Sequence, residues 1–138
     1  MKRGLIPIAT LKTADRFMEE LRNTSIPIPC DPELLPVSRS PLAQQTEVFG
    51  KKLFNRFAIQ PMEGWDADAS GLPTEHTYRR WRHFGASCAA LIWGGEAVAV
   101  REDGRATSRQ LLLSKATQMG ILSLLESLKK ERKRFASD

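Results

Sequence analysis

The sequence has few cysteines and no long apolar run. Its two cysteines, Cys30 and Cys88, lie far apart and lack the paired spacing of a zinc ribbon, so we expect two free thiols, with Cys88 buried at the start of an apolar strand. No apolar run approaches the ~20 residues that a membrane helix needs. The N-terminal stretch, whose short apolar run is interrupted by Pro7, is a poor signal peptide. These absences predict a cytoplasmic protein with no membrane partner.

Metal and catalytic patterns are also missing. His76 and His83 are seven residues apart, which is not the i, i+4 spacing of a helical metal-ligand pair, so we expect surface histidines. The carboxylates Glu63, Asp66 and Asp68 lie in a turn-rich segment that does not match a metal-binding loop, and a solvated loop is the simpler interpretation. We therefore predict no metal site and assign no catalytic residue.

Positive charge is confined to one end of the chain. The formal net charge is +5, and five basic residues lie between Lys129 and Arg134, so the rest of the chain is neutral by count. A basic run at the end of a helix is favoured by the helix dipole alone. The alternative hypothesis is a small basic nucleic-acid-binding or interaction protein that uses this run, but only Phe135 could stack on a base there. Nucleic acid is therefore not the partner that we expect.

The first 39 residues differ in pattern from the rest. Thr13 can cap a short amphipathic helix that runs through Leu21 or Arg22. Four prolines between residues 23 and 40 then exclude a helix or a central strand. We expect an N-terminal extension over residues 1–39 and a second domain over residues 40–138.

The second domain begins with a predicted hairpin and continues as a βαβ unit. Ser40–Lys52 contains strand formers around a turn-like glycine, and Asn55–Met62 alternates like a strand that closes on Pro61. Thr74 can cap a helix through Phe84 that Gly85 stops. The apolar run from Ala89 to Trp93 predicts a strand buried on both faces. We expect Gly94 and Gly95 to end it.

Units that consist of a strand, a loop, a helix and a second strand form parallel sheets. In such folds, ligands bind at the loops that follow the strands. A last helix is expected to start near Ser114, with an apolar stripe that includes Leu124 and Leu128. In the preceding helix, Tyr78, Trp81 and Phe84 are spaced to face the core.

The motifs NRFAIQPMEGW, GLPTEHTYRRW and LIWGGEAVAV resemble the N-terminal part of the old yellow enzyme family, the FMN-dependent NAD(P)H:flavin oxidoreductases. The resemblance covers Ser40 to Asp138, nearly three-quarters of the chain. Each motif alone is weak, and the specificity comes from five of them in the right order and spacing. The residues that carry it are Ser40, Pro41, Leu42, Asn55, Arg56, Pro61, Met62, Leu91, Ile92, Glu96, Ala97, Gly104 and Arg105.

The resemblance implies an α/β fold, namely the N-terminal part of a TIM (β/α)8 barrel with about two parallel strands and their helices. FMN would lie at the carboxyl ends of the strands and pass hydride from NADH or NADPH to an activated alkene. By analogy with the family, Gln60, Pro61, Met62 and Glu63 would hold the flavin ring through backbone groups. Ala97 would meet the polar edge of the ring.

Three positions depart from the family pattern. Glu63 stands where Thr or Cys is common, which puts the usual hydrogen-bond tuning of the flavin in doubt. Trp65 stands near a substrate-facing Tyr position and could stack on a substrate but has no acidic hydroxyl. Gly94 and Gly95 lengthen the end of the second strand by one residue.

The family's remaining site residues have no counterpart among these 138 residues. They are a flavin-binding Gln, a His pair or His/Asn pair, a catalytic Tyr and a phosphate-binding Arg, and a closed barrel of this type needs ~250 residues. We therefore expect a truncated portion that is inactive alone. A separate C-terminal half, or further copies of the chain, would complete the site.

Overall fold

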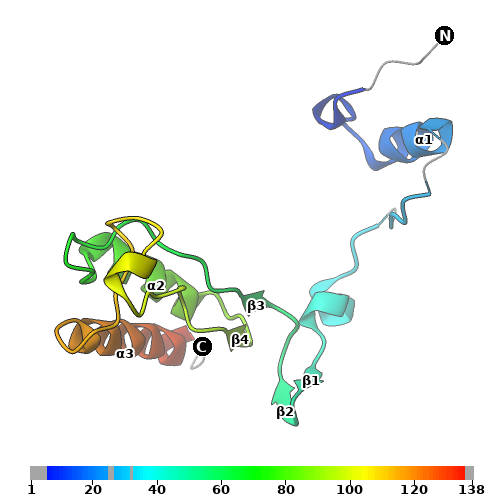
Figure 1. The fold of residues 1–138 in the computed structure, drawn as a ribbon. Coiled ribbons are helices and arrows are strands. Elements are labelled where there is room, and N and C mark those ends of the chain that lie inside the picture. Colours follow the sequence, from blue (N-terminus) through cyan, green and yellow to red (C-terminus); the bar gives the residue numbers. More distant parts are fainter. Residues whose placement is uncertain (1–5, 25–26, 32, 136–138) are drawn as a thin grey trace. The chain divides into compact units, whose positions relative to one another are not determined.

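The computed structural model describes residues 6–24, 27–31 and 33–135 (Figure 1). The chain divides into two compact units, Met1–Ser40 and Pro41–Asp138. Each unit is described by itself below, and the residues with a site-like arrangement all belong to the second.

In its described residues, the first unit contains one α-helix, α1 (Ala14–Thr24), and a 3-10 turn at Ile8–Thr10 precedes it. The Thr13 hydroxyl accepts a hydrogen bond from the Arg16 backbone N–H at 3.3 Å, as expected of the predicted N-cap. None of the residues of α1 is buried. In the proline-rich segment the described residues form no α-helix and no strand, and a 3-10 turn lies at Val37–Arg39.

The second unit opens with a 3-10 turn at Pro41–Ala43 and a β-hairpin. Strands β1 (Thr46–Val48) and β2 (Lys51–Leu53) pair antiparallel. The two turn residues, Phe49 and Gly50, have φ angles of 50° and 71°. Left-handed conformations at both positions match the twist of a two-residue hairpin turn, and the predicted hairpin is confirmed.

The centre of the second unit is a parallel βαβ arrangement. Strands β3 (Ala58–Ile59) and β4 (Leu91–Ile92) pair in parallel, and helix α2 (Glu75–Ala86) connects them. Two isolated parallel bridges continue the pattern beyond the strands. The fold is therefore mixed α/β with two small sheets, and the described residues form no closed barrel.

Helices α2 and α3 (Gln118–Phe135) pack together to form the core. Trp81 from α2 meets Leu124 and Leu128 from α3, as the apolar stripes of both helices predict. Tyr78 and Phe84 are partly buried against this core, so the face expected for these aromatic residues is confirmed. The buried residues of the cluster are Ala67, Trp81, Leu111, Leu124 and Leu128.

Three local predictions are wrong. Helix α2 passes through Gly85 and ends at Ala86, so Gly85 does not stop the helix; it is a contact position, where a Cβ would overlap the Leu128 carbonyl of α3. Strand β4 is shorter than the predicted run from Ala89 to Trp93 and is only half-buried. The described residues place no further strand beside it on the side away from β3. Cys88 is exposed with a φ of 57°, so it is a turn residue and not a strand residue.

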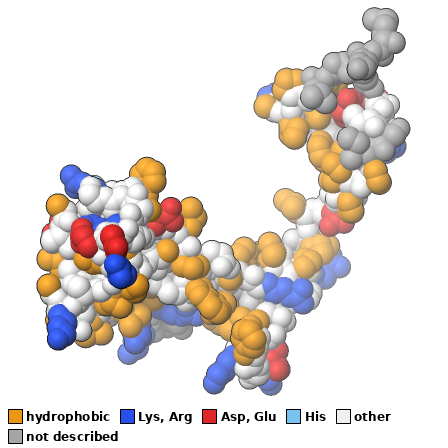
Figure 2. Space-filling model, in the orientation of Figure 1, with side chains coloured by type: hydrophobic (Ala, Val, Ile, Leu, Met, Phe, Trp, Pro, Cys, Tyr) orange, Lys and Arg blue, Asp and Glu red, His pale blue; other side chains and the backbone are white. Residues whose placement is uncertain are grey.

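Many large apolar side chains of the second unit remain exposed, and Figure 2 shows hydrophobic side chains across its surface. Trp65 and Trp93 are 66% and 57% exposed, which is unusual for the largest apolar residue. None of the helices within the described ranges is long and apolar enough to cross a membrane. The surface therefore offers apolar area for ligands or partners.

Candidate functional site

The loops that follow β3 and β4 lie side by side. Met62 and Glu96 form a parallel bridge, and the Ala97 N–H donates to the Met62 carbonyl at 3.2 Å. The Ala97 carbonyl in turn accepts a hydrogen bond from the Gln110 side-chain amide at 2.8 Å. The carboxyl ends of the two parallel strands thus form one continuous edge, where ligands bind in α/β folds.

A groove of about 470 Å³ lies along this edge, and we call it the polar groove. Four of the six residues predicted to contact flavin or substrate line it, namely Gln60, Met62, Glu63 and Trp65. The other two do not: Pro61 is half-buried, and Ala97 contributes to the strand-end bridge instead. The remaining lining residues are Ile59, Gly64, Arg80, Phe84, Gly95 and Glu96.

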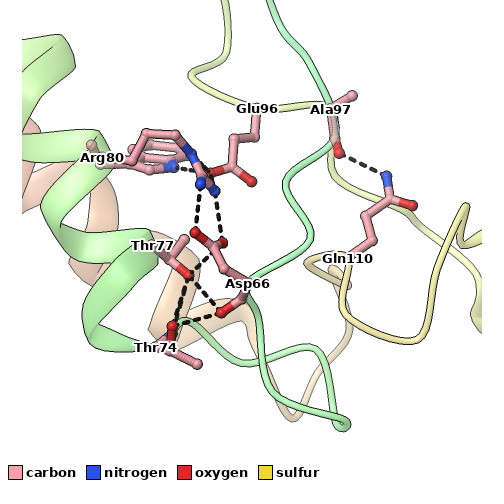
Figure 3. A network of polar contacts seen from close by, with 8 residues as sticks. Asp66, Thr74, Thr77, Arg80, Glu96, Ala97 and Gln110 are labelled. Atoms are coloured by element: carbon pink, nitrogen blue, oxygen red, sulfur yellow. Dashed lines mark hydrogen bonds and ion pairs between the residues drawn. The ribbon is translucent and has the colours of Figure 1, made fainter.

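One guanidinium joins the two loops. Arg80 of α2 donates from Nε to Glu96 Oε1 at 2.9 Å, and its Nη2 contacts the same oxygen. On its other side it donates from Nη1 to Asp66 Oδ2 at 2.5 Å and from Nη2 to Asp66 Oδ1 at 2.8 Å (Figure 3). Because Asp66 follows β3 and Glu96 follows β4, Arg80 fixes the separation of the two strand ends.

The first turn of α2 binds the same loop. The Thr74 hydroxyl donates to the Asp66 carbonyl at 2.6 Å, and the Thr77 hydroxyl donates to Asp66 Oδ1 at 3.1 Å. The Thr74 N–H donates to the Thr77 hydroxyl at 3.2 Å, which caps the helix start as predicted. Asp66 is therefore a structural anchor, and its prediction as part of a solvated loop is wrong.

The ion pair of Asp66 and Arg80 is held in its ionised form. Burial alone would raise the pKa of Asp66, but its hydrogen bonds and ion pair with Arg80 outweigh burial and lower that pKa. The hydrogen bond to Asp66 and the bonds to Glu96 raise the pKa of Arg80 despite its partial burial. Neither Asp66 nor Arg80 is therefore suited to exchange protons near neutral pH.

Glu96 is the most deeply buried member, with a side chain 2% exposed. Its Oε1 also accepts the indole N–H of Trp81 at 2.9 Å, whereas its Oε2 has no hydrogen-bond partner within the described residues. Oε2 lies against Gly64, where an added Cβ would come within 2.5 Å of it. The signal in the sequence that could have identified this site is the carboxylate of Glu96 inside an apolar run. A carboxylate that is buried needs a cation as its partner.

The groups left for a ligand are those on the exposed rim of the polar groove. Gln60 and Glu63 are exposed and offer an amide and a carboxylate, while Met62 and Trp65 are 73% and 66% exposed and offer apolar surfaces. Across the described ranges no group of three or more His, Cys, Asp and Glu could hold a metal ion. The arrangement is suited to binding a flat, partly polar molecule and not to acid–base catalysis.

The other predicted features lie outside this groove. His76 and His83 are exposed, as expected. In the basic run, Arg132 donates to the Ala90 carbonyl at 3.3 Å and lies 5.8 Å from the centre of the Phe54 ring, so it serves packing between α3 and the strand region. No family model matches this chain, and no curated protein matches it.

Proposed function

We propose that this chain forms one side of an FMN site in a flavin-dependent NAD(P)H oxidoreductase of the old yellow enzyme type, built on a (β/α)8 barrel. The observation that carries the proposal is the bridge between Met62 and Glu96, which joins the loops after two parallel strands. Those loops place Gln60, Glu63 and Trp65 around one groove.

The polar groove fits a flavin ring by the chemistry of its lining. An isoalloxazine has a flat apolar face and an amide-like edge, and it needs close main-chain approach on one side. Trp65 offers an exposed aromatic surface for stacking, and the Gln60 amide can both donate and accept. Gly64 and Gly95 also line the groove and contribute no side chain to it.

The groove does not supply a phosphate site. Its only basic lining residue is Arg80, whose guanidinium is already committed to Asp66 and Glu96. The chain would therefore hold the ring of FMN, while the phosphate requires basic groups from elsewhere. FMN supplies two-electron transfer from NADH or NADPH to an activated alkene when bound. The contribution of this chain is to orient the ring, exclude water from one face through Met62, and place Trp65 next to the substrate position.

Titration of the purified chain with FMN and with lumiflavin, which has the ring but no phosphate, tests this proposal. Flavin fluorescence reports binding of both compounds. We expect similar affinities for the two because the described groove recognises only the ring. Trp65→Ala should weaken both by about threefold to tenfold through loss of stacking.

Gln60→Ala should weaken both compounds by about fivefold, the equivalent of one hydrogen bond. Gln45→Ala is the matched control, since Gln45 is exposed and does not line the polar groove. The proposal fails if neither compound shows saturable binding, or if the Trp65 and Gln60 variants bind as well as the Gln45 variant. We do not extend the proposal to nucleic acid, because Arg132 packs against Ala90 and Phe54.

A further inference from the structure

The polar groove carries an excess of negative charge. Among the described residues, its charged lining residues are Glu63, Arg80 and Glu96. Arg80 pairs with both Glu96 and Asp66, so two carboxylates share one guanidinium and this network has a formal charge of −1 (Figure 3). Glu63 adds a second negative charge, because it is exposed and takes part in none of the ion pairs of the described residues.

The other basic side chains of α2 do not offset this charge. None of them lines the polar groove, and they are His76, Arg79, Arg82 and His83. Arg82 is paired with Glu75 instead. Arg79 and both histidines are exposed, where water and salt screen any charge that they carry. A molecule in the groove therefore meets more carboxylates than cations.

A buried carboxylate oxygen lies at the wall of the polar groove. The Glu96 side chain is 2% exposed, and its Oε2 has no hydrogen-bond partner within the described residues. This oxygen lies against Gly64, a lining residue that has no side chain to separate it from a ligand. Charges interact more strongly through a protein interior than through water. Glu96 Oε2 therefore favours a positive charge beside Gly64.

The rim of the polar groove has an aromatic surface near the exposed carboxylate. Trp65 is two residues from Glu63, is 66% exposed and lines the same groove. A cation lying on an indole face is attracted by the ring as well as by a nearby carboxylate. Met62 and Ile59 add apolar surface that alkyl groups can contact. This combination is suited to an alkylated ammonium group more than to a hydrated metal ion.

From these observations we propose that the polar groove binds an organic cation of the alkylammonium class. Glu63 is its specificity-determining residue, and Trp65 is its aromatic contact. The inference deepens the proposed function and rests on it for one point, namely that the bound cation is the substrate beside the flavin ring. The activated alkene would then carry an ammonium group. Binding of the cation itself requires no flavin.

Three small compounds of nearly the same shape test the charge preference of the full chain. Choline is a cation, 3,3-dimethyl-1-butanol is neutral, and 3,3-dimethylbutanoate is an anion. The methyl protons of each compound give one NMR signal, whose line width reports binding to any variant. We expect choline to bind about tenfold more tightly than the alcohol, and the anion to bind most weakly. The preference for choline should decrease with added NaCl, because salt screens the exposed Glu63.

Substitutions at the rim locate the binding. Glu63→Gln should weaken choline about fivefold and leave the affinity for the alcohol unchanged. Glu47→Gln is the matched control, because Glu47 is exposed on β1 and does not line the polar groove. Trp65→Leu should also weaken choline about fivefold, and its control is Trp93→Leu, since Trp93 is 57% exposed and lies outside the lining. All four residues are exposed, so these changes spare the fold.

The inference is overturned if choline shows no saturable binding, or if the alcohol or the anion binds as tightly as choline. It is also overturned if the Glu63 and Glu47 variants bind choline alike. The choline titration contains no flavin, so its outcome is separate from that of the lumiflavin titration. Lumiflavin binding without a preference for choline rejects the cation alone, whereas choline binding without lumiflavin binding rejects the flavin site alone.

Discussion

The two grooves of the second unit depend on different kinds of interaction. The polar groove depends on directional bonds, since Arg80 fixes Asp66 and Glu96 at hydrogen-bond distances. A second groove of about 460 Å³, the apolar groove, lies beside β4 and α3. It depends on packing, since its lining has hydrophobic side chains, two glycines and a single amide, that of Gln118. Directional bonds specify a geometry and fail abruptly, whereas packed apolar surfaces tolerate small shifts. The polar groove is therefore suited to one shape of ligand, and the apolar groove to a range of apolar shapes.

Trp81 and Gly95 connect the two grooves. The indole N–H of Trp81 bonds Glu96 at the polar groove, and its ring lines the apolar groove. Gly95 lines both grooves, and a Cβ there would come within 2.6 Å of the Trp81 ring, at a φ of 71°. One aromatic residue thus contacts both grooves, and substitutions elsewhere can separate the two contributions.

Removal of the Glu96 carboxylate should break the polar groove most severely. Glu96→Ala leaves Arg80 and the Trp81 N–H without their buried acceptor. We expect the free energy of unfolding of the second unit to fall by about 3 kcal/mol. Urea unfolding followed by tryptophan fluorescence measures the change.

Glu126→Ala is the control for this substitution, because Glu126 is exposed on α3. It should change the unfolding free energy by less than about 0.5 kcal/mol. Equal stability of the Glu96 and Glu126 variants would contradict the view that the network holds the polar groove.

Much of the second unit follows from local sequence patterns. The hairpin at β1 and β2, the cap at Thr74 and the core-facing position of Trp81 each depend on a few neighbouring residues, and each was predictable. The parallel pairing of β3 and β4 was also predictable, because a strand–helix–strand order permits few arrangements.

The Arg80 network was not predictable in the same way. The helix contains four other arginine or histidine residues, and only the packing of α2 selects Arg80 as the partner of both Asp66 and Glu96. Gly85 is a similar case, because a glycine near a helix end favours a stop, whereas here it permits the contact with α3. Contacts between elements that are distant in sequence determine both the choice of Arg80 and the role of Gly85.

A methyl group at Gly85 should disturb the apolar groove and leave the polar groove intact. In Gly85→Ala the added Cβ meets the Leu128 carbonyl and approaches Glu131 Cβ within 3.1 Å. Because α3 must move away from α2, we expect a loss of about 2 kcal/mol in unfolding free energy. Binding of lumiflavin at the polar groove should not weaken.

Gly104→Ala provides the comparison, since a Cβ at Gly104 has only Arg101 near it, at 3.9 Å. Its unfolding free energy should stay within about 0.5 kcal/mol of the parent chain. If both glycine variants are equally stable, helix contact at Gly85 does not set the width of the apolar groove.

The smallest expected effect is that of the Asp66–Arg80 ion pair, which the pH dependence of the unfolding free energy can isolate. Burial raises the pKa of Asp66, but the hydrogen bonds and charge of Arg80, together with hydrogen bonds from Thr77 and the backbone, lower it further, so the folded pKa lies below the ordinary value of 3.8. The stabilisation is therefore fully present above about pH 4 and is lost as the pH falls through the folded pKa. Asp66→Asn should cost about 1 kcal/mol near pH 7, because one partner of the pair is about one-third exposed.

The difference between the parent chain and Asp66→Asn should shrink as the pH falls below 3.8. Urea unfolding of both proteins at a series of pH values measures it. Asp103→Asn is the matched control, because Asp103 pairs with Arg101 on an exposed 3-10 turn and its pKa is also lowered, mainly by the hydrogen bond from Arg101. A pH-dependent loss of the same size in both variants would mean that Asp66 acts as an ordinary surface carboxylate, and the polar groove would then depend on Glu96 alone.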